Sequence, residues 1–263
     1  MRWIFLLFYI FPVFGAYVGN PASPGIMNTG FFSGHSPYFK CTSGYLADYN
    51  SNKQYTAVTK NADAAQNFHD FALHSQMATL SAIFVERLEI FGAAGGSKEH
   101  AKWDHQPTYK DFETILTDFQ SKYTFSWAAG AKVILIKWWQ TYLGADFTYF
   151  DVPSSQQSFF KFLNRLNLPM DTEKQTFSIQ EWQASLGLSS RIFIITPYAG
   201  ITYLRSKLNI DAGADVPPLY YENKDRIGYF YGATLSLTGR FHLNFERRVR
   251  DEFSYSLAAI AVF

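Results

Sequence analysis

The charged side chains best placed to act together occupy alternate positions in segments whose intervening residues are apolar. They are Lys132, Asp146, Glu181, Arg226, Arg240, His242, Glu246, Arg248 and Glu252. If these segments are strands that enclose a water-filled lumen, such pore-lining residues would set the local potential and the solute preference. In a narrow barrel they would instead pair with one another and fill the interior as a structural network. The sequence leaves both interpretations open, and the mixed signs predict no strong selectivity for anions or cations.

No catalytic or metal-binding arrangement competes with these two interpretations. The sequence contains no H-E-x-x-H, no G-x-S-x-G and no dinucleotide-binding fingerprint. Residues 92–98, GAAGGSK, have the wrong spacing for a phosphate loop and fit a glycine-rich strand better. The six histidines form no pair with ligand spacing. We therefore predict no enzyme activity, no metal and no cofactor. A hydrolase with Asp and His residues at a barrel rim is a third hypothesis, which no sequence triad supports.

The composition favours strands that face lipid on one side and water on the other. Aromatic residues make up 19% of the 263 residues, and charged residues only 17%. The mean hydropathy is nevertheless −0.12, so the apolar residues are dispersed among polar ones. The formal net charge is +1 without a basic block, which excludes nucleic acid as an expected partner.

Strict alternation of apolar and polar residues predicts the strands. In residues 123–135, YTFSWAAGAKVIL, the odd positions are apolar and the even positions are small or polar. An alternating run of about a dozen residues is long for a soluble strand but suits a tilted membrane strand. Similar patterns predict ten strands, at about 39–49, 70–84, 87–101, 123–135, 139–149, 181–189, 193–206, 226–237, 240–250 and 252–263.

The connections between these strands alternate in length. Short turns are predicted near 85–87, 136–138, 189–191 and 238–240, and long polar segments at about 50–69, 102–120, 152–175 and 208–224. Short periplasmic turns and long external loops are typical of outer-membrane barrels. The short connection at 250–251 is an exception. We predict an all-β fold, a transmembrane antiparallel β-barrel of about ten strands, with twelve as the alternative.

The N-terminal region divides into two further segments. Residues 1–15 combine a positive start with a short apolar run and a small residue, which predicts a cleaved signal peptide. Residues 16–37 are rich in proline and glycine and predict an irregular lead-in, for which the lumen is one location. The barrel is then expected over residues 38–263.

Two local features leave alternatives open. Residues 159–168, FFKFLNRLNL, place apolar residues at helical spacing and predict a helix that either constricts the mouth or lies on the lipid surface. Cys41 is the single cysteine, so no internal disulfide can form. It would either cross-link a partner or serve as a small apolar residue on the first strand.

Several stretches resemble the chlamydial major outer membrane porin family. They are VGNP at 18–21, GYLADY at 44–49, FVERLEIFGAAG at 84–95, FSWAAGA at 125–131, LGADFTY at 143–149, EWQASLGLSSRIFIITPYAG at 181–200, and the strand layout of 231–263. The resemblance is discontinuous over most of the mature chain, and EWQASLGLS followed by TPYAG is its most specific element.

This resemblance implies a porin of the outer membrane that passes small hydrophilic solutes or ions. It also implies that outer-membrane lipid surrounds the barrel, that Phe263 is the terminal signal for barrel-assembly machinery, and that the protein is a homo-oligomer, a trimer. Major porins of that family are longer and cysteine-rich, whereas this chain has only Cys41. A cross-linked envelope role therefore does not carry over. The alternative function is a non-conducting barrel with a structural or adhesive role.

Overall fold

The computed structural model describes residues 19–27, 36, 38–51, 53–58, 67–105, 115–163, 169–170, 174–211, 219–249 and 253–263. The predicted signal peptide lies outside these residues, as does Glu252. Of the predicted lead-in, residues 19–27 and 36 are described. Among the described residues, no helix is long and apolar enough to cross a membrane.

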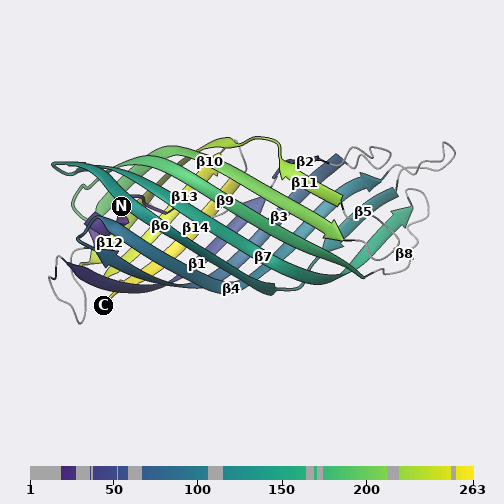
Figure 1. Ribbon diagram of the computed structural model, residues 1–263, viewed down its shortest axis with the longest axis horizontal. Coiled ribbons are helices and arrows are strands. Elements are labelled where there is room, and N and C mark those ends of the chain that lie inside the picture. Colours follow the sequence, from purple (N-terminus) through teal and green to yellow (C-terminus); the bar gives the residue numbers. More distant parts are fainter. Residues whose placement is uncertain are drawn as a thin grey trace, which may run out of the picture.

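Ten strands pair in chain order to close a cylinder (Figure 1). They are β1 (Phe39–Ser51), β3 (Asn67–Phe84), β4 (Leu88–His105), β6 (Thr124–Trp138), β7 (Thr141–Leu163), β9 (Lys174–Ser190), β10 (Ile195–Asp211), β12 (Ile227–Thr238), β13 (Phe241–Val249) and β14 (Phe253–Val262). Every neighbouring pair is antiparallel, and β14 pairs with β1 to close the ring. The predicted ten-stranded barrel is confirmed.

The short turns and the C-terminus lie together at one end, on the left in Figure 1. Phe263 donates its backbone N–H to the carbonyl of Cys41 (2.7 Å), beside the Val85–Arg87 turn region. We call this the turn end, and the opposite end the loop end. Two turns lie slightly after their predicted positions, because β6 continues to Trp138 and β9 to Ser190. Trp139 and Phe193 have left-handed backbone conformations there (φ 56° and 54°). Positive φ is uncommon for residues other than glycine, so the sequence does not predict it at aromatic residues.

The wall narrows toward the loop end. Four short strands form there: β2 (Tyr55–Ala57), β5 (Ile115–Gln120), β8 (Pro169–Met170) and β11 (Leu219–Asn223). β5 replaces β6 between β4 and β7, and β11 replaces β12 beside β10. β13 and β14 end lower down, and β2 pairs with β11 above them. At this level the described strands pair in the order β3, β4, β5, β7, β9, β10, β11 and β2, and the backbone N–H of Lys53, before β2, donates to the carbonyl of Phe71 on β3 (3.3 Å).

This upper wall overturns two predictions. The expected helix at 159–168 is wrong for residues 159–163, which continue β7 and pair with β5; residues 164–168 are outside the described part. The four long loops predicted at 50–69, 102–120, 152–175 and 208–224 are likewise partly strand, because barrel strands extend into them and β2, β5, β8 and β11 lie within them. Ladder pairing with a neighbouring strand outweighs the short helical pattern, whose helix would be marginal in isolation.

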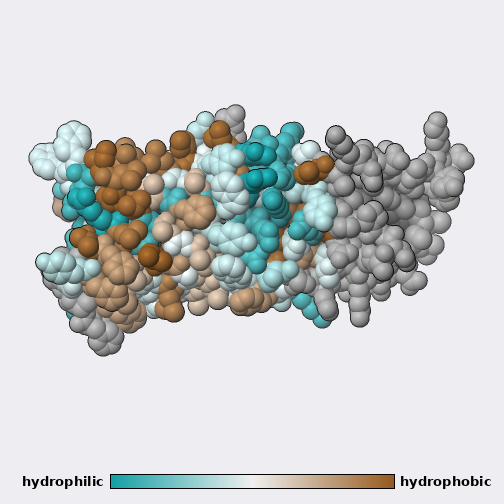
Figure 2. Space-filling view, viewed as in Figure 1, coloured by the Kyte–Doolittle hydropathy of each residue, from teal (hydrophilic) through white to brown (hydrophobic). Residues whose placement is uncertain are grey.

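Apolar side chains form a belt on the outer face near the turn end, where brown residues gather in Figure 2. The exposed members include Leu80, Ile90, Val133, Phe147, Leu186, Ile201, Tyr231, Phe245 and Leu257. Aromatic pairs occur on its loop-end side, for example Trp182 and Tyr203, whose ring centroids are 5.6 Å apart. Such girdles mark membrane interfaces. A band of hydrophilic residues follows the belt toward the loop end in Figure 2 and marks this edge of the bilayer.

Candidate functional site

The lumen at the level of the belt is polar. Register pairing places Glu89, Lys132 and Asp146 beside one another on β4, β6 and β7. Ser185 and Thr202 continue the same row on β9 and β10. All five side chains are buried, because alternate residues of each strand point inward. The alternation thus produces a charged row inside a wall that is apolar outside.

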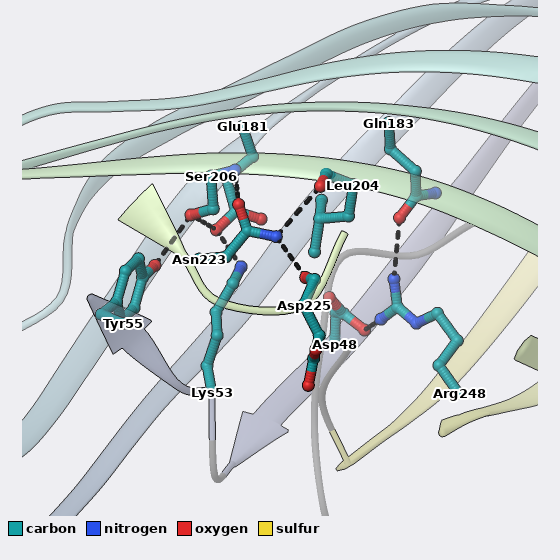
Figure 3. A network of polar contacts seen from close by, with 10 residues as sticks. All are labelled: Asp48, Lys53, Tyr55, Glu181, Gln183, Leu204, Ser206, Asn223, Asp225 and Arg248. Carbon is teal, nitrogen blue, oxygen red and sulfur yellow. Dashed lines mark hydrogen bonds and ion pairs between the residues drawn. The ribbon is translucent and has the colours of Figure 1, made fainter. Parts of the chain in front are cut away.

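A second group of charges centres on Arg248, which is fully buried on β13 (Figure 3). Its guanidinium lies 3.3 Å from the carboxylate of Asp48 and 3.8 Å from that of Glu246. It also donates to Gln183 Oε1 (3.4 Å) and Ser254 Oγ (2.8 Å). β1, β9, β13 and β14 are therefore connected across the lumen by one cation.

A third group lies where the wall narrows. Lys53 forms a buried ion pair with Glu181, and Ser206 donates to the same carboxylate (2.7 Å; Figure 3). Tyr55 bonds Ser206 through its hydroxyl (2.8 Å). Asn223 on β11 donates to the carbonyl of Leu204 (3.0 Å) and accepts from the backbone of Ser206. The network fastens β2 and β11 to the wall of the barrel.

Pairing within the middle lumen is incomplete. Glu181 Oε2, Gln183 Nε2 and Thr148 Oγ1 are buried without a hydrogen-bond partner among the described residues. A cavity of about 60 Å³ lies beside Thr148, where Asp48 and Lys132 share the lining with apolar side chains such as Leu73 and Phe91. Burying unpaired polar atoms is costly, and a cavity of this size has room for water beside its few polar groups. The middle lumen is therefore suited to hydration.

Residues 19–27 lie inside the turn end, and all are buried. They include α1 (Ser23–Ile26). Ser23 donates to the carboxylate of Glu89, and Asn20 donates to Thr234 Oγ1 (3.0 Å). Lys40 Nζ donates to the carbonyl of Met27 (3.0 Å). The segment thus spans the lumen from β12 to β1 and closes it.

The loop end is closed differently, by an apolar cluster inside the narrowed wall. Its members include Tyr55, Phe71, Leu73, Phe150, Val152, Phe177, Ile179, Leu208, Ile210 and Tyr221. Phe71, Val152, Phe177, Ile179 and Leu208 are each 0% exposed. A ring of about eight strands is only wide enough for side chains to fill it.

The predicted pore-lining residues fall into separate places. Lys132 and Asp146 lie together in the charged row, Glu246 and Arg248 in the second group, and Glu181 in the third. His242 is buried near the turn end, where its Nδ1 lies 3.0 Å from Ser236 Oγ. Arg226 and Arg240 are exposed, in the approach to β12 and in the β12–β13 turn. Arg226 pairs with Glu222 on the outer surface (3.1 Å).

Sequence reasoning missed five lumen residues: Lys40, Asp48, Lys53, Glu89 and Asn20. Lys40 and Asp48 share the inward face of β1, so a stricter use of alternation would have found both. The same applies to Glu89 on β4. Lys53 and Asn20 lie outside the ten barrel strands, and no periodic signal indicates where their side chains point.

Comparison with known proteins gives consistent relatives. A family model described as Chlamydia major outer membrane protein matches residues 165–217. The major outer membrane porin of Chlamydia trachomatis serovar L1 is 23% identical over 276 aligned positions, covering 74% of this chain and 70% of that protein. The major outer membrane porin of Chlamydia abortus is 29% identical over 120 positions, covering 37% of this chain and 31% of that protein.

Among solved structures, the outer membrane protease OmpT from Escherichia coli aligns with a TM-score of 0.42 and 9% identity, covering 86% of this chain and 95% of that one. The closed barrel, its apolar belt and the sequence relatives place the chain in the outer membrane. They also confirm the resemblance stated from the sequence: this chain is similar to the chlamydial major outer membrane porins.

Proposed function

We propose that the protein is an outer-membrane porin for passive diffusion of small hydrophilic solutes or ions, and that it is not an enzyme. The observation that carries the proposal is the charged, incompletely paired lumen at membrane level, inside a closed barrel related to major outer membrane porins. Such a lumen favours water and small polar solutes over lipid. Conduction requires that the two closures relax, since both ends are blocked in the described conformation.

The packed loop end favours a second function, that of a non-conducting barrel with a structural or adhesive role. The apolar cluster there is fully buried and belongs to the wall itself. A pore that is filled with apolar side chains excludes water and ions from its path. The upper wall would then be a stable platform that presents the external connections.

Single-channel recording of the refolded mature protein in a planar bilayer tests the two functions. Stepwise, ohmic openings are expected of the porin. Silence from protein that circular dichroism and heat-shifted gel mobility show to be a folded barrel would exclude the porin and favour the structural role. Hydrolytic activity of purified barrel against peptide or lipid substrates would contradict the non-enzymatic part of the proposal.

The proposal includes processing and assembly. Residues 1–15 act as a cleaved signal peptide, and Phe263 is the terminal residue that barrel-assembly machinery reads. The half-exposed C-terminal strand end, paired with β1, is consistent with that role. A homo-oligomer is expected from the resemblance alone. Cross-linking of native membranes, followed by mass determination, tests the oligomeric state.

A further inference from the structure

Residues 19–27 fit the lumen wall closely at several points. A Cβ atom added to Gly144 would lie 2.5 Å from the carbonyl oxygen of Pro21, and one added to Gly187 would lie 2.8 Å from its Cγ. In the opposite sense, a Cβ added to Gly25 would lie 2.7 Å from Ile134 Cδ1. Real side chains do not tolerate such distances. The wall therefore has glycine where this segment approaches it, and the segment has glycine where the wall approaches it.

The segment is held mainly by polar contacts and a small apolar patch. Besides the contacts of Ser23 and Met27, Asn20 Oδ1 accepts from Ser189 Oγ (2.8 Å). Ala22 and Ile26 pack against Ile134 and Tyr142. Residues 19–27 belong to none of the barrel strands. Met27 packs in addition against Ile83 and Val262. Each hydrogen bond of the segment adds only about 1 kcal/mol net, and no ladder bond has to open for the segment to move.

Asn20 is also the first member of a hydrogen-bond chain into the charged lumen. Thr234, which accepts from Asn20, donates to Asn244 Oδ1 (2.9 Å). Asn244 donates to the hydroxyl of Tyr198 (3.0 Å), which donates to Glu246 (3.0 Å). Because Glu246 lies beside Arg248, the position of the segment is linked to the central ion group.

The segment separates two spaces. Below it, at the turn end, lies a vestibule of about 650 Å³ lined by Gly25, Glu86, Lys137, Gln140, Arg191 and Phe193. Above it lies the small cavity of the middle lumen, whose lining includes Glu89, the partner of Ser23. Gly25 thus forms part of the vestibule's inner wall. Moving these residues aside would join the vestibule to the charged row.

We propose that residues 19–27 are a displaceable gate that controls access from the turn end to the charged lumen. The inference rests on the proposed porin function for its physiological meaning, since it names the element that regulates entry. According to this proposal, the constriction at the turn end is formed by residues 19–27 and not by an external loop. The gate packs against Gly144 and Gly187 of the wall and is hydrogen-bonded to Glu89, Thr234 and Ser189.

Thiol labelling tests the gate without requiring conduction. Ser185→Cys, in a Cys41→Ser background, places a reporter on the lumen face two residues from Gly187, beyond the gate. The apolar cluster blocks approach from the loop end, so a small cationic thiol reagent must pass the gate. The gate is weakened by Asn20→Ala with Ser23→Ala. The matched control is Ser75→Ala with Ser97→Ala, which removes the two 2.7 Å hydrogen bonds that join Ser97 on β4 to Ser75 on β3 and Ser126 on β6 instead.

We expect slow labelling in the reporter protein, at least tenfold faster labelling in the gate variant, and no change in the control variant. Heat-shifted gel mobility verifies that each variant is a folded barrel. Equal rates in all three proteins would overturn the gate, and so would fast labelling with the native segment in place. Absence of single-channel openings would count against the porin function only, because the labelling rate is independent of it.

Discussion

The two ends of the lumen are closed by different chemistry. At the loop end, side chains of the wall itself meet in an apolar cluster, and Phe177 and Val152 are 0% exposed. At the turn end, a separate segment occupies the lumen through hydrogen bonds to Glu89 and Thr234 and a fit to Gly144. The first closure can be removed only if the apolar side chains of the barrel wall unpack. Removing the second requires the loss of a few polar contacts and of the packing of Ala22, Ile26 and Met27, but of no barrel strand.

This difference indicates how the energy of the fold is distributed. The apolar cluster stabilises the narrowed wall outside the bilayer, where the outer surface contacts water and burial inside is favourable. The turn-end segment lies within the membrane-level barrel, whose wall is already stabilised by complete strand pairing. The loop-end closure is thus expected to dominate stability, and the turn-end closure to dominate access.

The largest effect is expected from Phe177→Ala in the apolar cluster. Truncating a fully buried phenylalanine typically costs about 4 kcal/mol, through lost burial and the cavity left behind. Guanidinium unfolding followed by tryptophan fluorescence measures this loss. Phe193→Ala is the matched control, because Phe193 is 92% exposed in a turn and its truncation should leave the midpoint unchanged. A similar loss in both variants would show that the cluster is not the principal source of stability.

The second effect concerns the buried ion pair below that cluster. Glu181→Gln removes the charge that faces Lys53, whose side chain is 0% exposed, and leaves an uncompensated ammonium. Breaking a buried pair from one side costs about 3 kcal/mol. The same unfolding experiment measures it, and Lys53→Met in addition should restore part of the stability. If the double variant is less stable than Glu181→Gln alone, the pair is not the cause.

The third effect is smaller and concerns the gate. Gly144→Ala adds a methyl group against Pro21 and should cost about 1–2 kcal/mol, the usual penalty of overpacking. In a protein lacking residues 19–27, the same substitution should cost nothing, because its neighbour is absent. Gly92→Ala is the control, since its nearest neighbour would be 4.0 Å away. An equal penalty with and without the segment would mean that the strain arises in the wall.

The barrel was predictable because one rule, alternation, governs both faces of every strand. It also identified Lys132, Asp146 and Arg248, whose side chains alternate with lipid-facing residues. The closures were less predictable, although the sequence gives the lumen as one location for residues 16–37. The local pattern of residues 159–163 predicts a helix. Their pairing with β5 is a long-range interaction and leaves no signal in that pattern. The position of Asn20 in the lumen depends on its hydrogen bond to Thr234, more than two hundred positions away in the chain. No local pattern encodes that contact.

The smallest effect is expected at an ion pair on the outer face of the narrowed wall. Arg205 lies 2.7 Å from Glu222, and its hydrogen bond and charge lower the pKa of that carboxyl. A lowered pKa stabilises the fold above the carboxyl's unfolded pKa, and this contribution disappears as the pH falls through the folded value. Solvent screens such exposed pairs, so Glu222→Gln should not move the unfolding midpoint at pH 7 measurably. Glu181→Gln, on the inner face of the same wall, provides the contrast. If the two substitutions destabilise the protein equally, the buried pair of Lys53 and Glu181 contributes no more to stability than the exposed pair of Arg205 and Glu222. The ion pair inside the wall would then not stabilise the loop end.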